Sequence, residues 1–305
     1  MCIFRCNYSI YLKLLIVRVF LYTTFALVAF AFNSILCRLA LRGEEADAAG
    51  FTTVRLVSGA VALVVIWYLV GRSTDARAKN TLPTGRVSAL GSWASAFFLF
   101  AYAVCFSFAY LGLTAGSGAL ILFGSVQMSM VTAAIFKGER PSALESLGLV
   151  IAVSGLIYLV LPGLASPPLT SSLLMAAAGM SWAAYTLRGK SSTDPLADTA
   201  GNFVRSLPMA AVVAIVFLPN LQLTPRGWLL AIVSGAITSG VGYTIWYSVV
   251  KNHTTTRAAV LQLAVPVIAA MIGIIWLGET ATATLGIAAA MILGGIAVTI
   301  AGKRA

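Results

Sequence analysis

Residues 135–155 read IFKGERPSALESLGLVIAVSG, and residues 275–295 read IWLGETATATLGIAAAMILGG. At an offset of 140 positions, Gly138-Glu139 matches Gly278-Glu279, Phe136 matches Trp276 and Gly155 matches Gly295. The alignment needs no gap from about residue 116 to residue 160, and in each copy the Gly-Glu pair separates two apolar runs. A repeat of this kind indicates that the chain is built from two related halves.

Two earlier matches extend the repeat towards the start of each half. Leu41-Arg42-Gly43 resembles Leu187-Arg188-Gly189, and Val54-Arg55 resembles Val204-Arg205. The offset changes from 146 to 150 to 140 along the chain, as loops of different length would cause. The order of the rare residues carries the repeat, because apolar residues match by chance in any strongly hydrophobic sequence.

The composition is that of a membrane protein. Apolar residues make up 60% of the 305 residues, charged residues only 10%, and the mean hydropathy is +0.95. Soluble domains carry about a quarter charged residues. A bilayer core about 30 Å thick needs about 20 apolar residues at 1.5 Å rise each, so ten spans would occupy about two thirds of this chain. Short loops remain, and no separate soluble domain.

The apolar runs predict an all-α polytopic membrane protein. We expect residues 1–17 to form an N-terminal tail, 18–162 a first five-helix repeat and 163–305 a second. A unit of five spans starts its second copy on the opposite side of the membrane, so the repeats are inverted, as is characteristic of secondary transporters. The ten predicted transmembrane helices lie near 18–40, 51–70, 87–110, 115–136, 143–161, 169–187, 199–218, 227–250, 257–277 and 282–302.

The distribution of Lys and Arg predicts that both termini are cytoplasmic, because cytoplasmic loops carry the excess of basic residues. On the outer side of the membrane we expect only Arg38, Arg42 and Arg226. Arg55 and Arg205 lie within spans. The cytoplasmic side then holds fifteen of the 20 basic residues: Arg5, Lys13, Arg18, Arg72, Arg77, Lys79, Arg86, Lys137, Arg140, Arg188, Lys190, Lys251, Arg257, Lys303 and Arg304.

Several function classes lack their usual residues. The net charge of +11 falls in short clusters at span ends rather than along one face with aromatics, so we expect no nucleic acid partner. The four cysteines and the single His253 have no metal-ligand spacing, and no Walker A, HExxH or paired-aspartate pattern is present. We therefore expect no enzyme, no metal and no cofactor.

Arg55 and Arg205 are the first candidates for substrate contact. A cation within the hydrocarbon region is costly, so it usually faces the bundle interior or a water-filled cavity. The alternative is that each side chain extends to the interface or pairs with Asp47 or Asp198, which precede Arg55 and Arg205 by about two helical turns. Both interpretations stay open at this point.

Further polar and aromatic residues lie within spans and could line a substrate cavity. Amides in lipid need a partner, so they face other helices or a cavity, and the aromatics could form a wall for a planar substrate. Interhelical hydrogen bonds and simple packing are the alternatives. Pro266 predicts a helix bend beside the cavity. The remaining candidates are Asn33, Tyr102, Gln127, Trp182, Tyr185, Asn202, Tyr243, Trp246 and Gln262.

Short motifs follow one another through the spans of both halves. The first half has Arg55, Gly116-Ser117-Gly118-Ala119 and Gly138-Glu139-Arg140. The second half has Trp182-Ala183-Ala184-Tyr185, Gly242-Tyr243, Trp246-Tyr247, Pro266 and Gly278-Glu279-Thr280. In this order, over roughly residues 20–302, they resemble the drug/metabolite transporter superfamily, and more narrowly its EamA-type family. Members often carry a proline in the fourth span, whereas Val126 stands opposite Pro266 here.

The resemblance implies a secondary transporter of the bacterial inner membrane that exports or exchanges small metabolites such as amino acids by alternating access. A lipid or drug flippase of the same fold is the alternative, and a channel or an intramembrane enzyme is less favoured. The expected partners are a small-molecule substrate and the lipid bilayer, with monomer and homodimer both open. The nine acidic residues all lie at span ends or in loops, which favours uniport or exchange over a proton-driven antiporter.

The topology gives a testable prediction. After replacement of the native cysteines, single cysteines are introduced as Ser73→Cys and Thr224→Cys. An impermeant thiol reagent applied to intact cells should label the second variant and spare the first, because the basic asymmetry places residue 73 inside and residue 224 outside. The reverse labelling pattern would contradict the orientation.

Overall fold

A computed structural model describes residues 2–78, 91–136, 142–160, 167–252, 261–262 and 264–302. Apart from an isolated bridge between Ala46 and Leu223, the regular elements of these residues are helices, which confirms the all-α class. They are α1 (Cys2–Arg42), α2 (Ala48–Ala78), α3 (Trp93–Ala109), α4 (Ala115–Phe136), α5 (Ala143–Val160), α6 (Leu169–Gly189), α7 (Pro195–Val216), η1 (Leu218–Asn220), α8 (Pro225–Val233), η2 (Ser234–Val241), α9 (Gly242–Val250), α11 (Ala264–Leu277) and α12 (Ala283–Gly302).

The helices match the predicted spans. Five contain an apolar stretch long enough to cross a bilayer, namely Val17–Arg42, Ala48–Val70, Ala115–Ala133, Pro195–Val216 and Pro225–Val250. Four shorter apolar helices, Trp93–Ala109, Ala143–Leu159, Ala264–Leu277 and Ala283–Thr299, correspond to predicted spans three, five, nine and ten. α6 lies at the sixth span, and α8, η2 and α9 together form the eighth.

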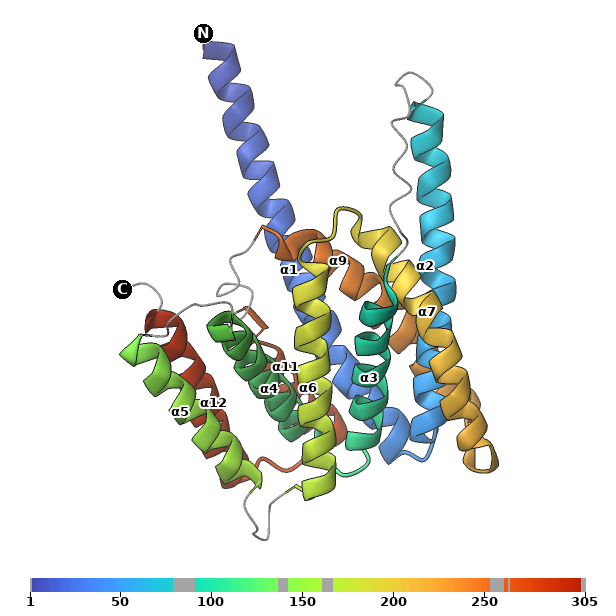
Figure 1. Ribbon diagram of the computed structural model, residues 1–305, viewed down its shortest axis with the longest axis vertical. Helices are drawn as coiled ribbons and strands as arrows, with labels where there is room; N and C mark the ends of the chain where they lie inside the picture. Colours follow the sequence, from blue (N-terminus) through green and yellow to red (C-terminus); the bar gives the residue numbers. More distant parts are fainter. Residues whose placement is uncertain are drawn as a thin grey trace.

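The two halves run in opposite directions and interlock (Figure 1). α1 descends from the upper side of the view, whereas α6, the first helix of the second half, ascends from the lower side. α1 packs on α8, η2, α9 and α11 of the second half, and α6 packs on α3 and α4 of the first. α2 with α7, and α5 with α12, pair helices at equivalent positions of the halves. Much of each half's contact surface is therefore supplied by the other.

Helix caps recur in the two halves. Ser142 caps α5 by accepting a hydrogen bond from the amide of Glu145 at 3.2 Å, and Thr282, 140 positions later, caps α12 at 3.1 Å. Asp47 and Asp194 cap the starts of α2 and α7 in the same way, each through a carboxylate oxygen. Such caps satisfy amides that the first turn of a helix leaves unpaired. The repeat is therefore visible in local structure as well as in sequence.

Some details differ from expectation. The predicted N-terminal tail is helical from Cys2 and continues α1. The eighth span holds a π-helix, η2, where an uninterrupted α-helix was expected, and α7 contains Pro208 in its interior. Pro266 lies in α11, close to the start of the described part of that helix, and its bend stays a prediction. Lys137 to Pro141, His253, Arg257 and the starts of spans three and nine fall on stretches outside the described residues.

α5 and α12 touch through glycines. A Cβ added to Gly295 would lie 2.5 Å from the backbone nitrogen of Ala152 and 2.6 Å from the carbonyl oxygen of Gly148. Backbone atoms cannot move aside at little cost, so any larger residue at 295 would separate the two helices. Small residues commonly allow this close approach between membrane helices.

The pair Gly294 and Gly295 gives a matched test. Gly295→Ala should lower the thermal unfolding midpoint of the purified protein in detergent, with a cost of about 1–3 kcal/mol for overpacking. Gly294→Ala should leave it unchanged or raise it slightly, since a Cβ there meets nothing within 4 Å and Ala favours a helix over Gly. Equal midpoints for the two variants would contradict the α5–α12 contact.

Candidate functional site

Arg55 is buried at the centre of the bundle. Its side chain, 1% exposed, projects from α2 towards α3 and the segment formed by η2 and α9. Nε donates to Ser239 Oγ at 3.0 Å, and Nη2 donates to the hydroxyls of Tyr243 at 2.8 Å and Tyr102 at 3.3 Å. The guanidinium carbon also lies 5.0 Å from the ring centre of Phe106.

The charge of Arg55 has only neutral partners. Within the described residues the ion pairs are Arg38–Glu279 and Arg226–Glu45, and neither involves Arg55. Its Nη1 atom is buried and makes no hydrogen bond to any described residue. A buried cation is normally paired, so this arrangement favours an anion from outside the chain.

Asn33 of α1 completes a polar cluster next to Arg55. Its Oδ1 accepts hydrogen bonds from Ser234 at 2.9 Å, Thr238 at 2.6 Å and Ser239 at 3.2 Å, all in η2. Its Nδ2 donates to the Tyr243 hydroxyl at 3.4 Å. We call Asn33, Arg55, Tyr102, Ser239 and Tyr243 the central cluster. It joins three helices of the first half, α1, α2 and α3, to η2 and α9 of the second half.

The π-helix and its glycine let α2 approach this closely. A Cβ on Gly235 would lie 2.1 Å from the backbone oxygen of Arg55, so only glycine fits there. π-helical turns are rare and occur frequently at functional sites. The wider turn brings Ser234, Thr238 and Ser239 into contact with Asn33. η2 therefore contributes both to the packing of α2 and to the polar contacts of the central cluster.

Trp182 of α6 closes the central cluster with aromatic contacts. Its ring centre lies 4.7 Å from that of Tyr243, 5.1 Å from that of Tyr102 and 5.3 Å from that of Phe30. Its Nε1 donates to Gln262 Oε1 at 3.3 Å. The hydroxyl ends of the two tyrosines therefore face Arg55 while their rings face an apolar wall.

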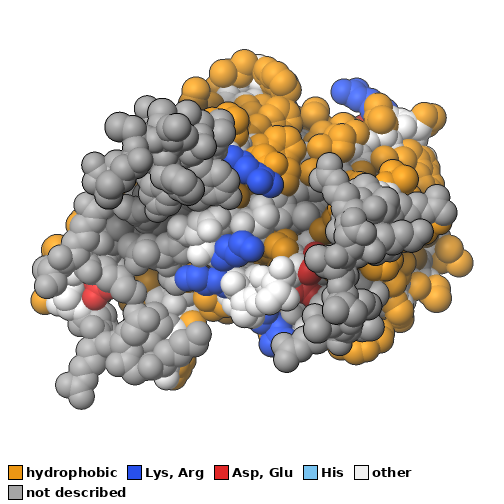
Figure 2. Space-filling view, turned by 90° about the horizontal axis from the view of Figure 1, so that it is seen from above, with side chains coloured by type: hydrophobic (Ala, Val, Ile, Leu, Met, Phe, Trp, Pro, Cys, Tyr) orange, Lys and Arg blue, Asp and Glu red, His pale blue; other side chains and the backbone are white. Residues whose placement is uncertain are grey.

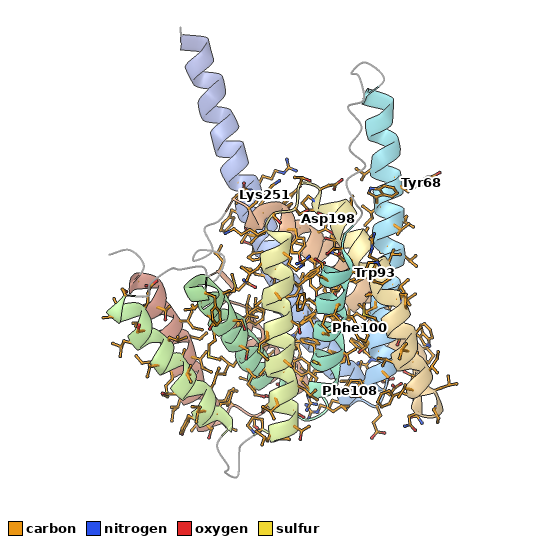
Figure 3. The ribbon with its side chains drawn as sticks, viewed as in Figure 1. Tyr68, Trp93, Phe100, Phe108, Asp198 and Lys251 are labelled. Atoms are coloured by element: carbon orange, nitrogen blue, oxygen red, sulfur yellow. The ribbon has the colours of Figure 1, made fainter. Side chains whose placement is uncertain are left out.

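A cavity of about 420 Å³ opens at the upper ends of α3, α6, α7 and α9, and we call it the upper cavity. Figure 3 places Asp198 at this end of the bundle and Phe108 near the opposite end of α3. In the view from above, Lys, Arg and acidic side chains gather near the middle of this face (Figure 2). The cavity is lined by Gly91, Ser92, Ser95, Arg188, Gly189, Ser191, Ser192, Asp198, Asn202 and Tyr247.

A column of aromatic rings joins the upper cavity to the central cluster. Tyr247, in the cavity wall, stacks on Tyr185 at 5.2 Å and donates its hydroxyl to the Tyr185 carbonyl at 2.7 Å. Tyr185 lies 5.8 Å from Trp182, which contacts Tyr102 and Tyr243. The rings separate the cavity from Arg55 and have an apolar body with polar tips.

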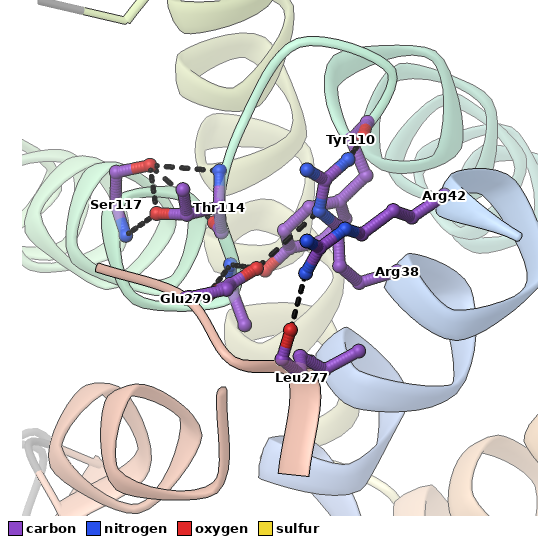
Figure 4. A network of polar contacts seen from close by, with 8 residues as sticks. Arg38, Arg42, Tyr110, Thr114, Ser117, Leu277 and Glu279 are labelled. Atoms are coloured by element: carbon purple, nitrogen blue, oxygen red, sulfur yellow. Dashed lines mark hydrogen bonds and ion pairs between the residues drawn. The ribbon is translucent and has the colours of Figure 1, made fainter. Parts of the chain in front are cut away.

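The lower end of the bundle is tied by charged contacts (Figure 4). Both carboxylate oxygens of Glu279 accept from the backbone amide of Ala115, at 3.0 and 2.9 Å, at the start of α4. Arg38 of α1 contacts Glu279 at 3.3 Å and donates to the Tyr110 carbonyl at 3.0 Å, and Arg42 donates to the Leu277 carbonyl. We call these residues the lower cluster. A carboxylate at a helix N-terminus is also favoured by the helix dipole.

Comparison with known proteins bears on this arrangement. Residues 169–301 match the EamA-like transporter family. "Uncharacterized protein PA1977" of Pseudomonas aeruginosa is 44% identical over 93% of this chain and 95% of its own length. "Probable terminal-alkyne amino-acid exporter" of Streptantibioticus cattleyicolor is 28% identical over 63% of this chain and 68% of its own length. A solved crystal structure with a TM-score of 0.63 and 18% identity covers 93% of this chain and 99% of its own, and shares the fold.

The chain belongs to the EamA-like transporter family. It is therefore a multi-pass membrane transporter of small molecules and not an enzyme. The expected membership of the drug/metabolite transporter superfamily is confirmed.

The structure brings most predicted site residues of this EamA-like transporter together, but not all. Arg205 is half-buried and donates to the Gly201 carbonyl of its own helix at 3.4 Å, away from the central cluster. Asn202 lies in the upper cavity, where its Oδ1 accepts from the Ser92 amide at 2.9 Å. Trp246 is buried against Phe30, and Gln127 is buried on α4. Neither Asp47 nor Asp198 pairs with the arginine that follows it.

Several residues of the EamA-like site escaped the sequence analysis. Ser234, Thr238 and Ser239 lie in η2 and hydrogen-bond to Asn33, and none of them was among the candidate residues. Arg188 and Asp198 both line the upper cavity, although they stand at the ends of different helices. The local signal for the first group is the spacing of hydroxyl residues at 234, 238 and 239; no local signal indicates the second.

The lower cluster gives a testable prediction about stability. Arg38→Gln should lower the thermal midpoint strongly, at a cost of about 3 kcal/mol, because it leaves the Glu279 charge, 6% exposed, without its cation. Arg226→Gln, which breaks the Arg226–Glu45 pair with Arg226 65% exposed, should cost less than about 1 kcal/mol. Thermal unfolding in detergent measures both, and a larger loss for Arg226→Gln would contradict the structural role of Glu279.

Proposed function

We propose that this protein is a secondary transporter of the bacterial inner membrane that exports or exchanges amino acids or similar organic solutes. The observation that carries this proposal is the environment of the Arg55 guanidinium. It is buried, it forms no ion pair with an acidic residue of the described chain, and its buried Nη1 makes no hydrogen bond to a described residue. In this proposal Arg55 binds the carboxylate of the substrate at the centre of the bundle.

The chemistry around Arg55 supports an anionic group as its ligand. Hydroxyls of Ser239, Tyr102 and Tyr243 hold the guanidinium in place without neutralising its charge. A guanidinium can form two parallel hydrogen bonds to a carboxylate, which adds orientation to charge. The neighbouring face of Trp182 can accept an apolar side chain or, through a cation–π contact, a positive group.

The relatives point to the same class of solute. The Streptantibioticus relative is named for the export of an amino acid, and it matches about two thirds of this chain. An amino acid carries the carboxylate that Arg55 requires. Its size also suits the upper cavity, whose volume lies within the range of about 300–1,000 Å³ found for small-molecule sites.

Alternating access is the mechanism that we propose. The lower cluster ties α1, α4 and the loop between α11 and α12, while the upper cavity is open above the aromatic column. The start of α1 and the end of α12 lie at the upper ends of these helices in Figure 1, on the side that the basic residues predict to be cytoplasmic. Opening the lower side would separate Glu279 from Arg38 and from the α4 amide. The missing mid-membrane carboxylate supports exchange or uniport rather than proton-driven export.

Arg55→Lys tests the proposal, with Arg205→Lys as the matched control. The probe is whichever L-amino acid most raises the thermal midpoint of the wild-type protein in a panel of the common ones. Arg55→Lys should weaken its binding about tenfold or more, because an ammonium cannot form the paired hydrogen bonds of a guanidinium. Arg205→Lys should bind normally, since the hydrogen bond that Arg205 makes within the described part of the chain is to a carbonyl of its own helix.

Binding and thermal stability are measured for each variant in the same preparation, and counterflow is measured in proteoliposomes. Arg55→Lys with near-wild-type stability but weak binding and slow counterflow would support the proposal. Normal binding by Arg55→Lys would contradict it. Equal loss of binding and stability in both variants would assign the two arginines a structural role instead.

A further inference from the structure

The upper cavity contains one cationic and one anionic side chain that do not pair with each other. Arg188, near the end of α6, and Asp198, in the first turn of α7, both line it. The ion pairs of the described residues include neither of them. Opposite charges in a small cavity normally attract, so their separation requires that each is held by other contacts.

Arg188 is held by the start of α3. Its Nε donates to Ser95 Oγ at 3.0 Å and its Nη2 donates to Ser92 Oγ at 3.3 Å. These contacts use two of the five N–H donors of a guanidinium, so donors remain for a ligand in the cavity that Arg188 lines. The N-terminus of α3 adds a partial positive charge at the same place. This corner of the cavity therefore favours a carboxylate.

Asp198 is held from two sides. Its Oδ1 accepts from the Gly91 amide at 3.3 Å, and its Oδ2 accepts from Ser192 Oγ at 2.5 Å. Each carboxylate oxygen can accept more than one hydrogen bond, so capacity remains for a donor in the cavity. This corner favours an ammonium group.

We infer that the upper cavity binds an α-amino acid as a zwitterion, with its carboxylate at Arg188 and its ammonium at Asp198, before the solute reaches Arg55. This inference deepens the proposed function and rests on it. The cavity supplies a charge of each sign, whereas the central cluster supplies only a cation. The cavity is therefore the place where a zwitterion is distinguished from a simple carboxylate.

The amino group of the solute provides the test. The probe is again the L-amino acid that most stabilises the wild-type protein, compared with its N-acetyl derivative, which keeps the carboxylate and loses the positive charge. The wild-type protein should bind the free amino acid more tightly. Asp198→Asn should reduce that preference about tenfold, as expected for the loss of one charge-assisted hydrogen bond. Asparagine keeps an oxygen that can accept from the Gly91 amide.

Two further variants act as controls. Asp194→Asn changes the carboxylate that caps the start of α7, the helix that also carries Asp198. Asp194 does not line the cavity, so this variant should leave the preference for the free amino acid unchanged. Asp198→Glu keeps the charge and should retain most of the preference. Arg188→Gln should weaken the free and the acetylated probes alike, because both carry the carboxylate. Thermal midpoints of all variants identify any loss that arises from unfolding.

Each outcome decides between the two proposals. A wild-type protein that binds both probes equally, or an Asp198→Asn variant with an unchanged preference, would overturn the zwitterion site. If Arg55→Lys nevertheless loses binding, the proposed function stands without the zwitterion site. If Asp198→Asn loses the preference while Arg55→Lys binds normally, the cavity site stands and the central role of Arg55 fails. A panel in which no L-amino acid stabilises the protein would overturn the zwitterion site.

Discussion

A buried positive charge with no counter-charge among the described residues is the constraint on which the centre of this protein depends. The guanidinium of Arg55 lies among helices where water is scarce and where an unpaired cation is costly. The chain offsets this cost with oriented hydroxyl dipoles from α3, η2 and α9 and with the aromatic faces of Tyr102 and Phe106. Those groups reach Arg55 only because η2 is wound as a π-helix and because Gly235 lets α2 approach its backbone. The local irregularity and the central charge therefore require each other.

The repeat explains the scaffold, and the departures from the repeat explain the site. Caps at Asp47 and Asp194 recur, and the first helix of each half packs in the same way on the other half. Arg55 and Arg205 occupy matching positions in sequence, yet one is buried in a polar cluster and the other lies half-exposed on its own helix. A symmetric pair of buried cations would repel each other and double the cost of desolvation. Only Arg55 lies inside, and in our proposal it provides a single anion-binding point at the centre.

Sequence reasoning predicted the parts of this structure that depend on composition and order. The apolar runs predicted the helices, the rare residues Arg-Gly, Val-Arg and Gly-Glu indicated the repeat, and the order of short motifs through both halves indicated the family. The candidate list also included Asn33, Arg55, Tyr102, Trp182 and Tyr243, because a polar or amphipathic side chain within a span must find a partner. It could not separate Arg55 from Arg205, because the direction in which a helix faces depends on packing against helices more than 100 residues away. The π-helix and the meeting of Arg188 with Asp198 are tertiary results of the same kind.

The two ends of the bundle use charge in opposite ways, and this difference suits a transporter. At the lower end Arg38 and Glu279 satisfy each other and the start of α4, so these charges need no solute as a partner. At the upper end Arg188 and Asp198 are held apart by serines and backbone amides. In our proposal a zwitterion bridges these two side chains and then moves from the upper cavity towards Arg55 with no net charge. The desolvation cost of entering the low-dielectric interior is lower for a molecule with no net charge than for a free anion. At Arg55 its carboxylate would regain a charged partner while its ammonium meets aromatic faces rather than an acid. A site with one strong and one weak contact can hold the solute and still release it when the lower end opens.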